Sequence, residues 1–152
     1  MTVLTFTIIV VFALAAVAVK RVPAGQVYSL YRNGRPVRLL QPGTHVVLPL
    51  LDRVGHRIDL GGRVMRFDAS FDETTPVQGT VYWQVLEPER ADAVIESADQ
   101  LIRSGVLQAL QTETDADQQQ RREVACRLKT NLNQQLRERG VMVTRVELDA
   151  AA

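Results

Sequence analysis

An uncharged apolar run near the start of the chain limits what this sequence can fold into more than any other feature. The run extends from Val3 to Val19 and reads VLTFTIIVVFALAAVAV. As a helix with a rise of about 1.5 Å per residue it would be about 25 Å long, at the short end of membrane-spanning helices. Lys20 and Arg21 follow directly, and their long side chains can reach the lipid headgroups. We therefore expect residues 1–21 to form a single-pass transmembrane anchor.

A cleaved secretory signal peptide is the alternative interpretation of this run. Such a peptide begins with positively charged residues, whereas Met1 and Thr2 carry no side-chain charge. The absence of a basic start favours a retained anchor. Four small residues could nevertheless imitate a cleavage region: Ala13, Ala15, Ala16 and Ala18.

Basic residues on the domain side of the run predict its orientation. No acidic residue precedes Asp52. Because Lys and Arg close to a span prefer the cytoplasmic side, we expect a protein of the cell inner membrane whose domain faces the cytoplasm. The basic residues concerned are Lys20, Arg21, Arg32, Arg35 and Arg38.

Charge and cysteine content exclude several classes of protein. The chain has 152 residues and a formal net charge of +1, so it lacks the basic excess typical of nucleic-acid-binding domains. Its single cysteine, Cys126, excludes an internal disulfide. A chain of this length has room for one ordinary domain, which we place at residues 22–149, followed by a tail at 150–152.

Two extended segments around an Asn-Gly pair predict a β-hairpin directly after the anchor. The segments are Val27–Tyr31 and Val37–Leu40, and Asn33-Gly34 between them tolerates the positive φ values of a tight turn. His45 to Leu51 is then an apolar run in which Pro49 argues against a central strand. We expect this run at a sheet edge or in an irregular apolar loop.

Further strands follow along the chain. Residues Arg57–Leu60 and Val64–Phe67 look extended on either side of a Gly-Gly pair. From residue 77 to residue 85 apolar and polar positions alternate, which is the period of a half-buried strand. The apolar positions of this strand are Val77, Gly79, Val81, Trp83 and Val85.

Helical spacing takes over after the strands. Apolar residues recur at three- and four-residue steps from Ala91 to Leu110, and Gly105 leaves open whether one helix or two cover this stretch. A later helix is indicated by Asp115 and Asp117 at its start and Gly140 at its end. Its apolar stripe consists of Val124, Leu128, Leu132 and Leu136.

The order of these elements predicts the fold class. Val141 to Leu148 reads as a closing strand after the last helix. Strands followed by helices and one final strand are typical of an α+β domain, in which helices pack on one face of a mostly antiparallel sheet.

Four motifs occur in an order typical of one known family. They are Val22-Pro23-Ala24-Gly25-Gln26-Val27; Leu40-Gln41-Pro42-Gly43-Thr44-His45 with the following Leu48 to Val54; Val81 to Ala91; and the passage from Leu136 into Gly140-Val141-Met142-Val143. The first resembles V-P-x-G-x-V, the second L-x-P-G-x-H with x-P-x-x-D-x-V, and the third V-x-Y-x-V-x-D-P-x-x-A. With its apolar anchor, nearly the whole chain resembles the SPFH/Band 7 family of stomatins, prohibitins and flotillins.

This resemblance implies a scaffold that associates laterally on the bilayer and organises or regulates membrane proteins, with a membrane protease among the implied partners. Members usually continue from the last strand into a long charged coiled coil, whereas this sequence ends at Ala150-Ala151-Ala152. We therefore expect a short bacterial-type member without the coiled coil, as a homo-oligomer or a hetero-oligomer with another SPFH protein. Two alternatives remain, an accessory subunit of a full-length SPFH protein and an exported membrane-attached adaptor.

No pattern in the sequence predicts an active site, a metal site or a cofactor site. The two histidines, His45 and His56, have no thiol or carboxylate cluster beside them. Neither a phosphate-binding P-loop nor a GxSxG nucleophile motif is present. Cys126 lies beside the apolar stripe of the last helix and reads as a small, partly buried residue. We therefore expect a protein that is not an enzyme.

Basic and apolar residues near the anchor together suggest a membrane-proximal face. A basic side chain near an anionic leaflet contributes about 1 kcal/mol of binding free energy, and the effect decays over roughly a Debye length. The alternative is that the hairpin arginines only keep a turn solvated. The residues of the hypothesis are Lys20, Arg21, Arg32, Arg35, Arg38, Leu48, Pro49, Leu50 and Leu51.

Overall fold

The computed structural model describes residues 2–71, 75–111 and 118–150. The chain divides into two compact units, Met1–Asp59 and Leu60–Ala152. The first contains one helix and five short strands, and the second contains a three-stranded sheet with helices. The sheets of both units are antiparallel, which confirms an α+β protein.

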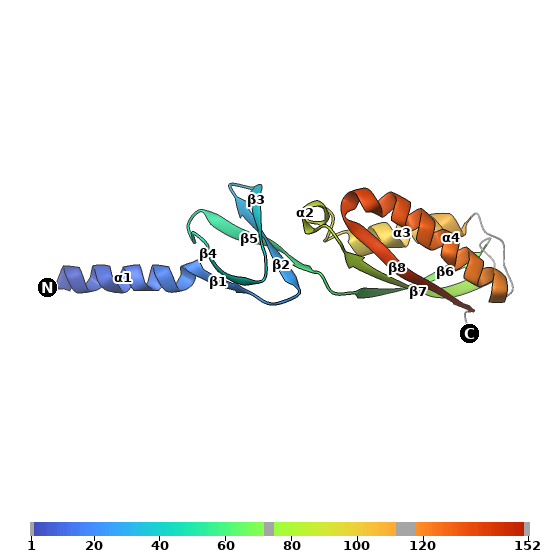
Figure 1. The fold of residues 1–152 in the computed structure, drawn as a ribbon, viewed down its shortest axis with the longest axis horizontal. Coiled ribbons are helices and arrows are strands. Elements are labelled where there is room, and N and C mark those ends of the chain that lie inside the picture. The colour runs from blue at the N-terminus through green and yellow to red at the C-terminus, as the bar shows by residue number, and fades with distance from the viewer. Residues whose placement is uncertain (1, 72–74, 112–117, 151–152) are drawn as a thin grey trace. The chain divides into compact units, whose positions relative to one another are not determined.

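Helix α1, Thr2–Ala18, opens the first unit and continues into strand β1, Val19–Val22 (Figure 1). Among the described helices, none has the length and apolar character needed to cross a membrane. The expectation of a transmembrane helix that ends beside Lys20 and Arg21 is therefore not supported. The physical reason lies in the backbone, because residues 19–22 pair with another strand and the helix stops at Ala18.

Five strands form two small sheets in the first unit. Strand β1 pairs with β4, Gly43–Val46. The other sheet has the order β3-β2-β5, formed by Arg35–Leu40, Gln26–Arg32 and Asp52–Asp59.

The predicted hairpin is confirmed, although strand β1 lies between it and the helix. Strands β2 and β3 are joined through Asn33 and Gly34, whose φ angles are 52° and 76°. Positive φ at both central residues is the geometry that Asn-Gly favours.

A small apolar core holds the two sheets of the first unit together. It consists of Val22, Leu30, Leu40 and Val47, with Tyr28 packed against it. The predicted apolar run is confirmed as an edge followed by irregular chain, because β4 ends at Val46 and the next strand begins only at Asp52.

The second unit is built on the sheet β6-β7-β8, formed by Arg63–Phe71, Thr75–Val85 and Val141–Ala150. The alternation predicted for β7 is confirmed, since residues 77, 79, 81, 83 and 85 are buried and their described neighbours are more exposed. Helices lie along one face of this sheet (Figure 1). The two long ones are α3, Ala98–Leu110, and α4, Gln118–Leu136. The unit also contains the short helix α2, Pro88–Ala91, and the 3-10 turn η1, Arg137–Arg139.

Most of the helical prediction is confirmed. The predicted stripe of α4, from Val124 to Leu136, is buried, and Gly140 ends η1 with a φ of 70°. Asp115 and Asp117, the predicted start of this helix, lie outside the described residues.

Gly105 lies inside α3 and does not break it. A Cβ atom at this position would come within 2.8 Å of Leu132 Cδ2, so the glycine allows α3 to pack closely against α4. The expectation that Cys126 is partly buried is wrong, because the residue is exposed.

We predict that Asn133→Ala lowers the free energy of unfolding by about 1–3 kcal/mol, the cost of a buried polar group that loses its partner. The Asn133 side chain accepts a hydrogen bond from the Val143 N–H (2.7 Å) and donates one to the Val143 carbonyl (2.9 Å). Val143 is fully buried. Denaturant unfolding, followed through the buried Trp83, measures the change. Asn131→Ala, at an exposed position of the same helix, is the control, and equal midpoints for the two variants would contradict the assignment.

Candidate functional site

The residues after β4 form a hydrogen-bonded turn that exposes apolar side chains. We call residues Leu48–Leu51 the apolar turn. The N–H groups of Leu51 and Asp52 both donate to the Leu48 carbonyl, at 3.1 and 2.8 Å. The side chains of Leu48, Leu50 and Leu51 are nevertheless exposed, Leu50 to 87%. The backbone of the turn is thus locally fixed while its leucines face outward.

An ion pair closes the base of the apolar turn. Arg32 is the last residue of β2, and its Nε donates to Asp52 Oδ1 at 2.7 Å. The other carboxylate oxygen of Asp52 accepts the Leu48 N–H at 3.3 Å. The side chain of Asp52 is only 3% exposed, whereas that of Arg32 is 44% exposed. The carboxylate therefore connects the end of β2 to the turn.

The pKa of Asp52 lies below its usual value. The hydrogen bond from Arg32 is the largest cause, and burial of the carboxyl group opposes it. The Leu48 N–H and the positive charges of Arg32 and Arg38 lower the pKa further. Asp52 is therefore ionised near neutral pH and keeps its acceptor oxygens available for both partners.

The apolar turn lies next to the end of α1. The N–H of Val47 donates to the Ala18 carbonyl at 2.8 Å. This bond continues the pairing of β1 with β4, in which Val19 lies opposite Val46. Arg38 reaches the same place from β3, since its Nη2 donates to the Val46 carbonyl at 3.4 Å.

The structure brings most residues of the predicted membrane-proximal face to one end of the first unit. Arg32 and Arg38 join the turn by the contacts above, and Arg35 lies opposite Arg32 across the hairpin. Lys20 is exposed in β1, opposite His45. Arg21 is also exposed but lies opposite Thr44, one pair farther from α1.

Asp52 is the residue that sequence reasoning missed as part of this site. In the sequence it stands out only as the first acidic residue after a long basic stretch. That position was the available signal, because a lone carboxylate after five cations is a natural ion-pair partner. Which cation it pairs with depends on the β2–β5 register, in which Arg32 lies opposite Asp52.

The two histidines occupy separate environments in the first unit. His45 Nε2 lies 2.7 Å from the Gln41 carbonyl, and His56 stacks edge-on against Tyr31. Over the described ranges of the chain, no group of three or more His, Cys, Asp or Glu side chains is arranged to hold a metal ion.

Fold and site together define an α+β domain that carries an exposed apolar helix and an apolar turn with basic neighbours. The sequence model of the SPFH domain / Band 7 family matches residues 20–151, nearly the whole chain after α1. The protein belongs to this family. SPFH proteins are generally membrane-associated scaffolds without enzymatic activity, and they commonly oligomerise.

We predict that Asp52→Asn weakens the apolar turn at neutral pH and has progressively less effect in acid. Because the folded-state pKa is lowered, ionised Asp52 stabilises the fold above the unfolded-state pKa, about 4. That stability is lost as the pH falls through the lower, folded-state value. Hydrogen exchange of the amides of residues 48–52 measures the effect. Wild type should be better protected than the variant at neutral pH, and the difference should shrink below about pH 4.

The control for this prediction is Asp68→Asn, which removes an exposed carboxylate from the second unit. It should leave the exchange of residues 48–52 unchanged at every pH. A difference between wild type and Asp52→Asn that stays constant into acid would contradict the role given to the ionised carboxylate.

Proposed function

We propose that this protein is a membrane-attached scaffold whose first unit lies against the bilayer and whose assembly organises or regulates membrane proteins, a membrane protease among them. The hydrogen bond from Val47 to Ala18 carries the proposal, because it sets the apolar turn directly beside the apolar helix. Two apolar segments that are distant in sequence thus share one end of the unit.

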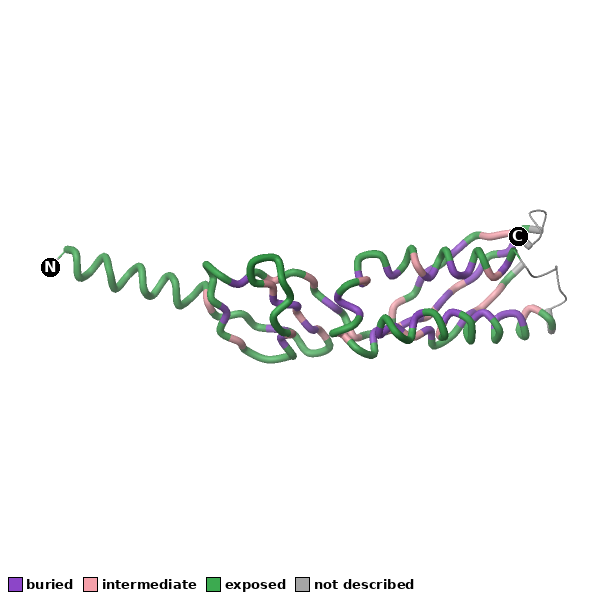
Figure 2. The backbone as a smooth tube through the Cα atoms, turned by 90° about the horizontal axis from the view of Figure 1, so that it is seen from above, coloured by how far each residue is buried: buried purple, intermediate pink, exposed green. Residues whose placement is uncertain are grey.

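Helix α1 supplies the anchor in this proposal. Residues 2–17 of this helix are exposed, and Figure 2 draws them in green. Phe6 and Phe12, for example, are 70% and 75% exposed. An apolar surface of this extent requires a cover of lipid or protein. The Thr7 hydroxyl donates to the Val3 carbonyl at 2.8 Å, so this polar group is satisfied within the helix and suits an apolar surrounding.

The apolar turn and the basic residues give the scaffold its contact with the bilayer surface. Leu48, Pro49, Leu50 and Leu51 insert among the headgroups, while the cations around them attract anionic lipid. Asp52 is buried and paired, so its charge does not oppose this attraction. The positive charge also favours the cytoplasmic leaflet of the inner membrane, which is where we place the domain. Lateral contacts with further copies or with another SPFH protein complete the assembly.

We predict that Val10→Lys combined with Val11→Lys releases the protein from membranes. Because an unpaired charge is costly to take out of water, two lysines on the apolar surface of α1 should lower partition into the bilayer by more than about tenfold. Extraction of membranes at alkaline pH measures this, with wild type in the pellet and the variant in the supernatant. Val64→Lys, at an exposed valine of the second unit, should stay in the pellet. Retention of the double variant would show that α1 is not the anchor.

We predict that a fluorophore on the apolar turn enters the lipid. Cys126→Ser removes the only native thiol, and Leu50→Cys then accepts an environment-sensitive dye. On vesicles with anionic lipid its emission should shift to the blue, and brominated lipid should quench it. The same dye on Val64→Cys, an exposed site in the second unit, should report water. An aqueous signal from position 50 on bound protein would refute contact between the turn and the membrane, whatever α1 does.

A further inference from the structure

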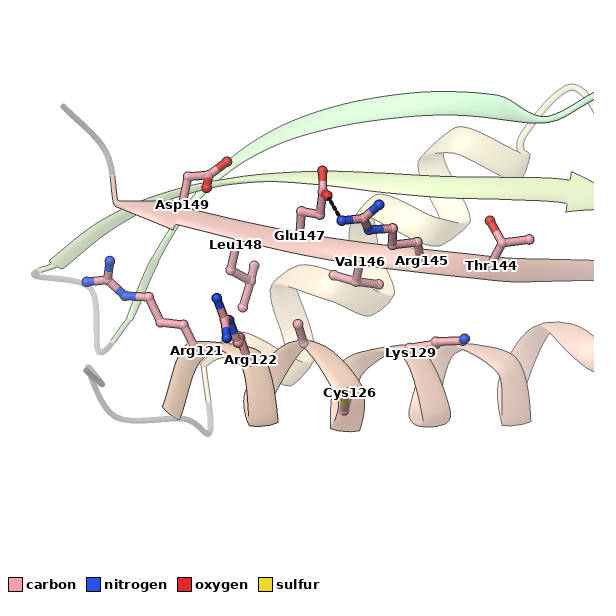
Figure 3. Close-up of a pocket in the computed structure, with 11 residues that line it drawn as sticks. Arg121, Arg122, Cys126, Lys129, Thr144, Arg145, Val146, Glu147, Leu148 and Asp149 are labelled. Carbon is pink, nitrogen blue, oxygen red and sulfur yellow. Dashed lines mark ion pairs between the residues drawn. The ribbon is translucent and has the colours of Figure 1, made fainter. Parts of the chain in front are cut away.

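A groove lies in the second unit between helix α4 and strand β8. Its volume is about 520 Å³. Figure 3 shows the residues of both elements that line it. From α4 it is lined by Arg121, Arg122, Ala125, Cys126 and Lys129, and from β8 by the six consecutive residues 144–149.

The groove follows the edge of the sheet. Strand β8 stands at the end of the order β6-β7-β8, and among the described strands it pairs with β7 alone. Successive residues of a strand point to opposite faces. Val146 and Leu148 point toward α4, whereas Glu147 and Asp149 point away (Figure 3). Residues from both faces line one groove, which places the strand edge itself along it.

The same edge already accepts a partner just before the groove begins. The side-chain amide of Asn133 bonds both the N–H and the carbonyl of Val143, at 2.7 and 2.9 Å. These are the two hydrogen bonds that a residue of a neighbouring strand would make. The edge of β8 at Val143 therefore faces α4, and from Thr144 onward it runs into the groove.

Positive charge dominates the groove. Glu147 pairs with Arg145 at 2.5 Å and accepts a hydrogen bond from the Tyr82 hydroxyl at 3.1 Å. Its negative charge is thus already compensated within β8. Arg122 and Lys129 are exposed on the α4 side. Four cations and two carboxylates line the groove in all, so an occupant of negative charge fits it best.

We propose that this groove binds an acidic extended segment of a partner protein, which adds to β8 as a further strand. Main-chain hydrogen bonds to the edge supply sequence-independent affinity, and alternate acidic side chains meet Arg122 and Lys129. At about 3.3 Å per residue, residues 144–149 offer an edge of about 20 Å. The binding site belongs to the second unit and does not depend on insertion of α1 into a membrane.

The test uses the full-length protein in detergent micelles and short synthetic peptides. The first peptide alternates Glu and Thr, and the second alternates Lys and Thr. The third has the Glu-Thr sequence, but every second backbone amide is N-methylated, so that one edge of the peptide lacks N–H donors. Fluorescence polarisation should show saturable binding of the first and at least about tenfold weaker binding of the other two, because they lack the charge or the strand hydrogen bonds. Equal binding of the three peptides, or no binding of the first, overturns the proposal.

Charge-reversed variants locate the binding site. Arg122→Glu with Lys129→Glu should weaken the Glu-Thr peptide at least about tenfold. The control pair Arg137→Glu with Arg139→Glu makes the same change of charge at exposed positions outside this groove and should leave the affinity unchanged. Circular dichroism checks that all variants fold. An equal loss of peptide affinity in both pairs of variants would mean that only the net charge of the protein matters, and it would overturn the site.

The thiol of Cys126 gives a readout on the unmodified protein, because this exposed cysteine is the only one in the chain and lines the groove. Saturating Glu-Thr peptide should slow its reaction with a bulky maleimide several-fold, and the N-methylated peptide should not. If no peptide protects the thiol and Arg122→Glu with Lys129→Glu lowers the native mass of the protein, a second copy occupies the groove and the proposal fails.

Discussion

The pairing of β1 with β4 is the interaction on which the first unit depends. It ends α1 at Ala18, because the backbone of the next four residues is committed to a strand. It also carries Val47 to the end of the helix, where one further hydrogen bond joins the two segments. Buried Val22 and Val47, on either side of this pairing, anchor it in the apolar core. Helix, turn and sheet therefore share one end of the unit.

Asp52 is a buried charge that holds an exposed turn in place. Its burial alone would raise its pKa, and the hydrogen bond from Arg32 outweighs that cost. The outcome is a carboxylate that holds the turn yet shows little negative charge to its surroundings. Exposed leucines can then sit among cations on a turn whose backbone hydrogen bonds are satisfied within the protein.

The edge of the sheet in the second unit differs between two parts of β8. At Val143 a side-chain amide from α4 completes the backbone hydrogen bonds, so this part of the edge is closed. Farther along β8 the groove separates strand and helix, and cations line it. An unpaired edge invites association with other chains. The positive charge along the groove favours acidic partners over others. Association there therefore depends on charge and not on exposed apolar area.

Local pattern was sufficient for most of the elements. Asn33-Gly34 specified a hairpin because few other residue pairs adopt two positive φ angles, and the alternation along β7 and the four-residue stripe of α4 each followed from one buried face. The motifs at residues 22–54 and 81–91 pointed to the SPFH/Band 7 family, which the match over residues 20–151 confirms. The basic and apolar residues of the candidate site were likewise visible in sequence.

Tertiary structure decided what depends on contacts between distant residues. The apolar run continued to Val19, but pairing with β4 ended the helix one residue earlier. Gly105 suggested a break, but close packing against Leu132 explains a glycine inside a continuous helix. The partner of Asp52 follows from strand register, and the groove beside β8 from the distance between a helix and a sheet edge. Composition and periodicity describe one segment at a time, whereas register and packing are set by two segments together.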